Sequence, residues 1–178
     1  MSDPYVESLR RGFKSRTIPG SCAIVIFGAT GDLTHRKLIP ALYNLYINNE
    51  LPESFKIIGF SRRDKNDELW RSELEQSNKE NSRSGHKDEV WEKFSSSLFS
   101  FRGDLNSEES FKELRNTIEK HETSVDTFHN RLFYLSTAPE FFPKVLNHLK
   151  SANTVIHIEP HGVGLSTSIL ESLILGIP

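Results

Sequence analysis

Short apolar runs alternate with amphipathic segments along most of the chain. This alternation is typical of a parallel sheet whose strands are connected by helices. We therefore predict an α/β fold, with a doubly wound parallel sheet and helices on both of its faces. The predicted strands are Ala23–Phe27, Lys56–Phe60, Leu98–Arg102, Arg131–Leu135 and Thr154–Ile158.

Two amphipathic helices are predicted between the last three strands. In the first helix, Asn106 is the expected N-cap and Glu109, three residues later, its capping-box partner. The apolar face of this helix consists of Phe111, Leu114 and Ile118. The second helix has the capping-box pair Thr137 and Glu140, followed by the apolar positions Phe141, Val145, Leu146 and Leu149.

Helix-breaking and polar residues predict where other segments begin and end. Pro40 has no N–H to donate, so we expect a separate turn over Gly31–Lys37 and a second helix that begins at Pro40. The stretch Gln76–Glu89 is almost wholly polar, which indicates a surface loop or the frayed end of a helix.

The end of the first strand has the strand–turn–helix pattern of a dinucleotide site. Gly28 can adopt the backbone angles of a tight turn, and Gly31 would let the backbone approach a pyrophosphate at the helix start. Thr34 stands where this fingerprint has Gly or Ala, and an ordinary turn between strand and helix is the alternative interpretation. The predicted cofactor-binding residues of this turn are Gly28, Ala29, Thr30, Gly31, Asp32 and Leu33.

The end of the second strand indicates which dinucleotide is preferred. The strand closes with Ser61-Arg62-Arg63, whereas an NAD site would place an acidic residue there to bind the ribose hydroxyls. Because the arginine guanidinium matches phosphate oxygens, we predict that Arg62 binds the 2′-phosphate of NADP. A solvated basic strand end is the alternative, and the nearby Asp64 weakens the preference without reversing it.

Four motifs in order identify the family that this region resembles. The turn Gly28–Leu33 is followed by Arg36-Lys37-Leu38 with Pro40-Ala41-Leu42, then by Gly59-Phe60-Ser61-Arg62, and then by Leu132-Phe133-Tyr134-Leu135 with Pro139. From about Ala23 to about Gly162 the chain resembles the opening of glucose-6-phosphate dehydrogenases. The resemblance implies a Rossmann-like NADP-binding domain over residues 21–162, an N-terminal tail over 1–20 and a divergent segment over 163–178.

The resemblance also implies roles for individual residues. In the family, the position of Arg62 contacts the 2′-phosphate, and the turn after the fourth strand lies along the cofactor, so Ser136 and Thr137 are candidate cofactor contacts. Lys37 corresponds to a family lysine near the active site and is a candidate substrate-binding residue. The implied reaction is the NADP-dependent oxidation of glucose 6-phosphate to 6-phosphogluconolactone, the entry to the pentose phosphate pathway.

The end of the chain departs from the family pattern. Where the family has Glu-Lys-Pro-Phe-Gly, the chain reads Ile158-Glu159-Pro160-His161-Gly162. Without a gap, Glu159 replaces the lysine that binds the sugar phosphate in the family; with a one-residue deletion, that lysine is missing. The family's later histidine motif, which supplies the general base, does not occur either. We therefore expect a truncated family member with no catalytic residues, without the larger α+β domain and its oligomer interface, and inactive by itself. A non-catalytic dinucleotide-binding remnant that regulates an intact enzyme is the alternative.

Composition narrows the class of partners. A net charge of -2 gives no reason to expect nucleic acid or a membrane surface as a partner. Cys22 is the only cysteine, which excludes an internal disulfide and fits a reducing compartment, so we expect a cytoplasmic protein. His157, Glu159 and His161 alternate as metal ligands might, but no cysteine or further histidine cluster accompanies them, so no metal is expected.

Overall fold

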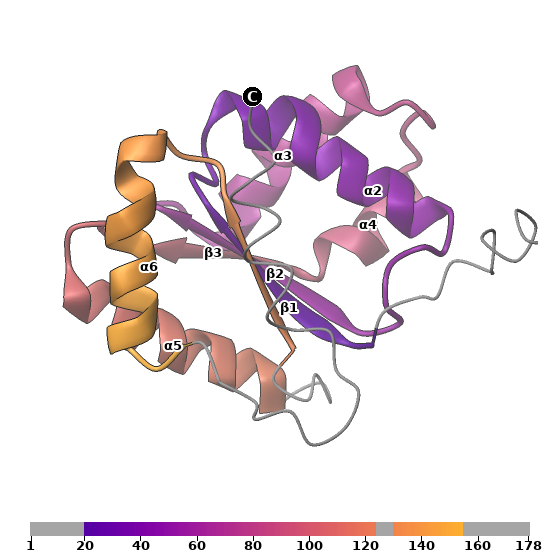
Figure 1. Ribbon diagram of the computed structural model, residues 1–178. Coiled ribbons are helices and arrows are strands. Elements are labelled where there is room, and N and C mark those ends of the chain that lie inside the picture. Colours follow the sequence, from indigo (N-terminus) through magenta and orange to yellow (C-terminus); the bar gives the residue numbers. More distant parts are fainter. Residues whose placement is uncertain (1–19, 124–129, 155–178) are drawn as a thin grey trace, which may run out of the picture.

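The computed structural model describes residues 20–123 and 130–154, which form a parallel sheet between two layers of helices (Figure 1). The strands are β1 (Cys22–Phe27), β2 (Phe55–Ser61), β3 (Leu98–Arg102) and β4 (Arg131–Leu135). They pair in the order β3-β2-β1-β4, and every pair is parallel. The predicted α/β fold and four of its strands are thus confirmed. Residues 155–158 of the fifth predicted strand lie outside the described residues.

Helices connect the strands and cover both faces of the sheet. They are η1 (Thr34–Leu38), α2 (Ile39–Ile47), α3 (Asp67–Asn81), α4 (Asp88–Ser95), α5 (Glu108–Thr123), η2 (Pro139–Phe141) and α6 (Phe142–Ser151). Helices α2, α3 and α4 pack on one face, and α5 and α6 pack on the other. No helix within residues 20–123 and 130–154 has the length and apolar character needed to cross a membrane.

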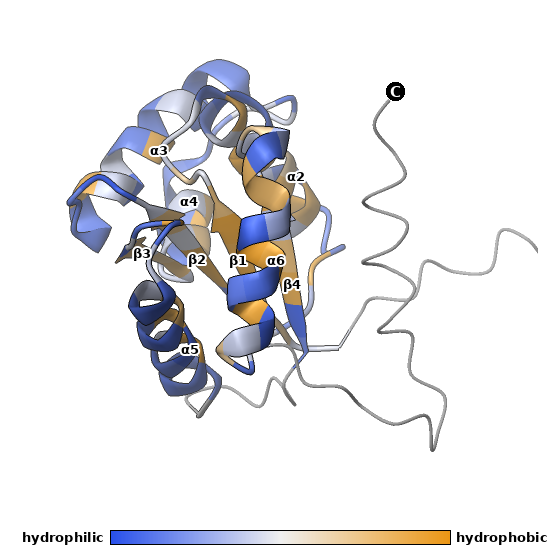
Figure 2. Ribbon diagram, turned by 60° about the vertical axis from the view of Figure 1, so that its left-hand side comes forward, coloured by the Kyte–Doolittle hydropathy of each residue, from blue (hydrophilic) through white to orange (hydrophobic). Residues whose placement is uncertain are grey.

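The central strand β1 is buried along its whole length, because it has a helical layer on each side. Successive side chains of a strand point to opposite faces, so Ile24 and Ile26 join the core under α2–α4. Val25 and Phe27 join the core under α5 and α6. Figure 2 shows the result as apolar strands inside helices whose outer faces are polar.

The apolar face predicted for α5 is confirmed, and Val145 and Leu149 of the face predicted for α6 are buried, whereas the predicted caps are wrong. Phe111, Leu114 and Ile118 are fully buried. However, the N–H of Ser110 donates to Oγ of Ser107, 3.3 Å away, while the amide of Asn106 turns back to Asp104. Ser107 therefore caps the helix, because its hydroxyl is three residues before the N–H that needs a partner.

The capping box predicted for Thr137 and Glu140 does not form. The chain enters α6 through the 3₁₀ turn η2, which begins with Pro139, and no side chain caps either segment. Proline is favoured at this position because its missing N–H would have no helical partner there.

The segment before Pro40 is helical rather than a separate turn. Asp32 and Leu33 begin the helical segment, η1 is one π-helical stretch, and α2 follows directly. The N–H of Ile39 donates to the carbonyl of Thr34, five residues earlier. The wider π turn lets the helix continue through the region of Pro40, which has no N–H. Pro40 stands at the start of α2, as predicted.

The polar stretch Gln76–Glu89 contains helix ends on both sides of a loop. Helix α3 continues to Asn81, and α4 begins at Asp88. Only residues 82–87 connect them, so most of the predicted loop is ordered helix or a short turn. The loop prediction thus holds for residues 82–87 alone, because three buried side chains, Trp70, Leu74 and Asn78, hold the polar helix α3 against the sheet.

Candidate functional site

The turn after β1 is formed around Gly28, whose φ of +86° favours glycine. A Cβ atom at Gly28 would lie 2.2 Å from the carbonyl oxygen of Ser136. This close approach brings the turn after β1 against the turn after β4. Two features therefore explain the predicted need for glycine at this position: the positive φ and the lack of room for a Cβ atom.

Neighbouring strands fix the turn through backbone hydrogen bonds. The N–H groups of Gly28 and Ala29 each donate to the carbonyl of Phe60 in β2, at 3.1 Å. The N–H of Ser136 donates to the carbonyl of Phe27 at 2.8 Å. The carboxyl ends of β1, β2 and β4 therefore meet here, which is the edge where open parallel sheets bind ligands.

Gly31 and Thr34 stabilise the turn through hydrogen bonds to the carbonyl of Gly28. The N–H of Gly31 donates to the carbonyl of Gly28 at 2.9 Å, and a Cβ at Gly31 would lie 3.1 Å from that oxygen. The hydroxyl of Thr34, fully buried, donates to the same carbonyl at 3.1 Å. Thr34 thus has a structural role at the position where the fingerprint has Gly or Ala.

The helical segment that follows offers backbone donors at the same edge. It begins at Asp32 and Leu33, both exposed, and the first N–H groups of a helix have no partner within it. Such a helix start attracts anions. The carboxylate of Asp32 lies 3.6 Å from the guanidinium of Arg36, one turn later.

Ser136 and Thr137 present hydroxyl groups beside Gly28. Their Oγ and Oγ1 atoms are buried and have no hydrogen-bond partner among the described residues. Buried polar atoms almost always have a partner. We call the space beside Gly28, which a single Cβ atom would fill, the cradle. With the unpaired hydroxyl groups of Ser136 and Thr137 beside it, the cradle fits a polar ligand that lies along these turns.

Arg62 lies at the same edge, directly after the last residue of β2, and it is exposed. The pKa of Asp104 is lowered, first by the backbone N–H of Asn106 and further by the charge of Arg62. Arg62 is thus near the end of β3 as well.

Asp64, the acidic residue that weakens the predicted NADP preference, has a partner of its own. Its carboxylate lies 3.0 Å from the guanidinium of Arg102, at the end of β3. Both side chains are exposed, at 78% and 65%. The partner neutralises part of the negative charge beside Arg62.

Lys37 is placed differently from the other predicted residues. It is exposed on η1, one turn beyond the start of the helical segment and outside the glycine turn itself. The structure therefore brings Gly28, Gly31, Ser136 and Thr137 together, with Arg62 along the same sheet edge and Lys37 on the adjacent helix.

Two residues that the sequence analysis missed lie beside the turn. The indole Nε1 of Trp70 donates to the carbonyl of Ala29 at 3.3 Å, and its ring packs against the backbone of Gly59. Trp70 belongs to α3, a helix that the apolar pattern did not predict. An Asn66 N-cap followed by Trp70 and Leu74 at helical spacing was the available signal.

His35 is the other missed residue, directly after Thr34. Its Nε2 is buried and has no partner among the described residues. Burial lowers the pKa of His35, with Glu73 opposing that effect. The charges of Lys65 and Arg63 lower the pKa of His35 further, so the positive charge of this region comes from lysine and arginine side chains.

The fold and the site define the class of protein: an α/β domain with the glycine turn of a dinucleotide-binding fold. A family described as "Glucose-6-phosphate dehydrogenase, NAD binding domain" matches residues 25–165. The chain belongs to the glucose-6-phosphate dehydrogenase family, as its motifs predicted.

Individual relatives agree with the family. A glucose-6-phosphate 1-dehydrogenase of Chlamydia pneumoniae is 39% identical over 156 residues, which are 88% of this chain and 30% of the relative. The enzyme of Chlamydia muridarum is 41% identical over 137 residues, 76% of this chain and 27% of the relative. The chain thus spans less than a third of the length of these relatives.

Solved structures show the same region. A glucose-6-phosphate dehydrogenase in complex with its substrate glucose-6-phosphate has a TM-score of 0.70 and 32% identity, covering 80% of this chain and 29% of that chain. The glucose-6-phosphate 1-dehydrogenase from Mycobacterium avium has a TM-score of 0.64 and 26% identity, covering 77% and 28%. The predicted coenzyme-domain architecture is therefore shown.

Proposed function

We propose that the chain is the NADP-binding part of an oxidoreductase that acts on glucose 6-phosphate in the cytoplasm. The observation behind this proposal is the cradle at Gly28, where the unpaired hydroxyls of Ser136 and Thr137 meet the glycine turn. The family membership supports a nicotinamide dinucleotide as the ligand of that cradle.

Each predicted residue has a part in this proposal. The turn from Gly28 to Leu33 lies along the pyrophosphate, with the helix start facing its negative charge. Ser136 and Thr137 donate hydroxyl hydrogen bonds to the cofactor, and Lys37 approaches the sugar phosphate of the substrate.

NADP is the preferred dinucleotide because Arg62 faces the 2′-phosphate. The ion pair of Asp64 with Arg102 supports this choice, since it reduces the repulsion that the phosphate would meet from the Asp64 carboxylate. A charge-assisted hydrogen bond contributes about 1.5–3 kcal/mol, so Arg62→Ala is expected to weaken NADP binding by about 10- to 100-fold.

Calorimetric titration of the 178-residue chain with NADP and NAD tests the assignment. Arg62→Ala should weaken NADP binding while leaving NAD binding unchanged, because NAD has no 2′-phosphate. Arg83→Ala is the matched control, since it removes an exposed arginine from the loop between α3 and α4. Equal affinity of the parent chain for both dinucleotides would contradict the NADP assignment.

We further propose that these 178 residues do not oxidise glucose 6-phosphate by themselves. The supporting observation is that no lysine directly precedes Pro160, where the family has the lysine that binds the sugar phosphate. Reduction of NADP, followed at 340 nm with glucose 6-phosphate, tests this. Binding of NADP without turnover supports a cofactor-binding part or a regulatory remnant; clear turnover would contradict the proposal.

A further inference from the structure

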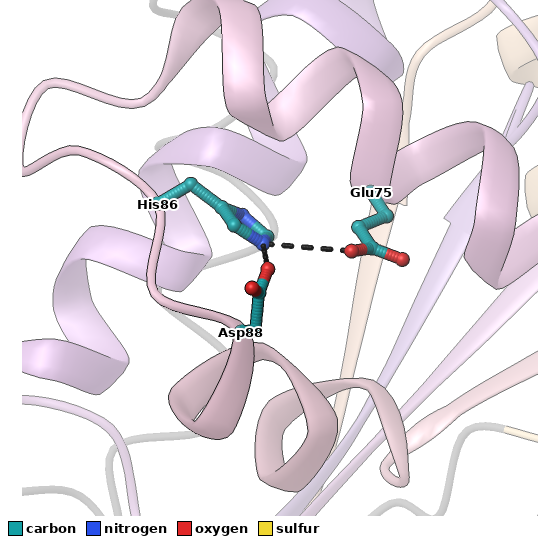
Figure 3. Close-up of side chains that lie close together, drawn as sticks. All are labelled: Glu75, His86 and Asp88. Carbon is teal, nitrogen blue, oxygen red and sulfur yellow. Dashed lines mark hydrogen bonds and ion pairs between the residues drawn. The ribbon is translucent and has the colours of Figure 1, made fainter.

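A second group of side chains with metal-binding chemistry lies on the outer side of the α2–α4 layer, away from the glycine turn. Glu75 comes from α3, His86 from the loop over residues 82–87, and Asp88 is the first residue of α4 (Figure 3). Nε2 of His86 lies 3.2 Å from Oδ1 of Asp88 and 3.6 Å from Oε1 of Glu75. The three ligand atoms all lie within 4.8 Å of one another.

The ring of His86 is held in one orientation. It stacks on Tyr43 at 5.9 Å between ring centroids and packs against Trp91 at 5.7 Å. Its side chain is only 9% exposed, and its Nε2 faces the two carboxylates. A ligand held in place by its neighbours loses little freedom when it binds a metal.

Asn78 contacts the other ring nitrogen of His86. The amide Nδ2 lies 3.1 Å from Nδ1, while Oδ1 of the fully buried Asn78 has no partner among the described residues. The two orientations of an amide have nearly the same shape. With Oδ1 toward the ring, Nδ1–H would donate to Asn78 and leave the lone pair of Nε2 free, which is the second-shell arrangement of metal-binding histidines.

We propose that Glu75, His86 and Asp88 bind a divalent transition-metal ion of the Zn²⁺ type. Ligand atoms about 2.0–2.1 Å from zinc lie about 3.3 Å apart in a tetrahedral site. The distances from Nε2 to the two carboxylates, 3.2 and 3.6 Å, match that spacing. The Asp88 side chain is 86% exposed and free to adjust the third distance. An imidazole ligand favours Zn²⁺ over Mg²⁺ and Ca²⁺, which prefer oxygen alone.

Lys79 is the competing cation at this site. Its ammonium group lies 2.7 Å from Oε1 of Glu75 and 3.8 Å from Oδ1 of Asp88, the same oxygen atoms that face His86. A metal ion must displace Lys79 from both carboxylates. Because Lys79 is 44% exposed, its side chain can turn into solvent when the ion binds.

A surface cavity of about 470 Å³ gives an ion access to the carboxylates. Glu75 and Asp88 line it together with three further carboxylates, Glu68, Glu89 and Glu92, and with one cation, Arg71. These further carboxylates make the approach negative, which attracts cations. Bound metal would join α3, the loop and α4, and so would fix the layer that covers the core around Tyr43 and Trp91.

Calorimetric titration of the 178-residue chain with ZnCl₂ and with MgCl₂ tests the proposal. We expect one Zn²⁺ per chain, bound at least tenfold more tightly than Mg²⁺. His86→Gln should weaken Zn²⁺ binding at least tenfold, and Lys79→Met should tighten it, because that variant removes the competing cation. His148→Gln is the matched control, a half-buried histidine that packs on Phe111 of the other helical layer.

The two variants keep the test decisive even if one of them folds poorly, which far-ultraviolet circular dichroism would show. Lys79 is exposed, so its replacement is expected to leave the fold intact. Zn²⁺ binding that survives His86→Gln, including binding through His157 or His161, overturns the proposal. The same holds if the parent chain binds Zn²⁺ no more tightly than Mg²⁺, or if Lys79→Met fails to tighten binding.

Discussion

The backbone of Gly28 combines two requirements that can be separated by mutation. Gly28 and Gly85 both have positive φ, +86° and +73°, but only Gly28 has a backbone carbonyl, that of Ser136, within 2.2 Å of the position of a Cβ. The space around Gly85 is open. The two glycines therefore form a matched pair for testing the close approach of β1 and β4.

Gly28→Ala is expected to lower the free energy of unfolding by more than about 3 kcal/mol, because it adds a backbone clash to the strain of the left-handed conformation. Gly85→Ala has the strain alone and should lose about 1 kcal/mol. Urea denaturation of both variants measures the difference. Equal losses would mean that the turns after β1 and β4 can separate without penalty.

Cys22 is expected to be unreactive in the folded chain. Burial raises the pKa of its thiol to about 11, and the thiolate is the reactive form. At pH 8 the native chain should react with a disulfide reagent at least about 100-fold more slowly than the chain in urea. A native rate equal to the unfolded rate would show that Cys22 is accessible at the start of β1.

At the scale of the elements, a buried ion pair connects α5 to β4. Arg131 donates to both carboxylate oxygens of Glu122 at 2.7 and 2.6 Å, and the side chains are 4% and 6% exposed. Arg131 also donates to the carbonyl of Thr154 at 2.8 Å. One guanidinium thus joins β4 to the end of α5 and to the chain after α6.

Arg131→Met should lower the free energy of unfolding by about 3–5 kcal/mol, since it removes the guanidinium that binds both oxygens of the buried Glu122 carboxylate. Arg115→Met is the control, because Arg115 makes a pair of 2.7 Å with Glu119 at 41% and 40% exposure. Half-exposed pairs of this kind contribute less than about 1 kcal/mol. Thermal unfolding measures the stability of both variants. A larger loss of stability for Arg115→Met would contradict the expectation that the buried pair contributes more than the half-exposed one.

The elements also show how far the sequence predicts the structure. Strands such as Ala23–Phe27 are predictable because continuous apolar residues have few alternatives to a buried strand. The polar helix α3 was missed because only one residue per turn, Trp70, Leu74 and Asn78, reaches the core. The wrong cap at Asn106 has a similar cause, since Asn106 and Ser107 both suit an N-cap and only packing selects Ser107.

The candidate site also contains features that the sequence predicts and features that arise only when the chain folds. The need for Gly28 can be predicted from the sequence, because its turn geometry requires glycine. The phosphate-binding role of Arg62 stays a prediction, based on its charge and planar donors. The support of Ala29 by Trp70 is not readable, because the two residues are far apart in sequence and meet only after α3 packs on the sheet.

For the whole molecule, the histidines in the two helical layers predict how stability depends on pH. Burial lowers the pKa of His35, beneath α3, and of His121, which stacks on Phe99 of β3 at 4.0 Å. Lys56 and Lys120 lower the pKa of His121 further, whereas Asp67 and Glu73 oppose the shifts at His121 and His35, respectively.

The sign of the effect follows from proton binding in the two states. Below about pH 6.5 the histidines of the unfolded chain bind protons that the folded chain does not yet accept. The two histidines cause no loss of stability above that pH, and the free energy of unfolding should fall as the pH drops from about 6.5 toward 5.

Urea denaturation at a series of pH values measures how steeply the free energy of unfolding falls with pH. The double variant His35→Asn with His121→Asn should show a flatter slope than the parent chain. If the double variant loses stability as steeply as the parent, the acid sensitivity resides in the carboxylates, and the neutral histidines beneath the two helical layers do not control it.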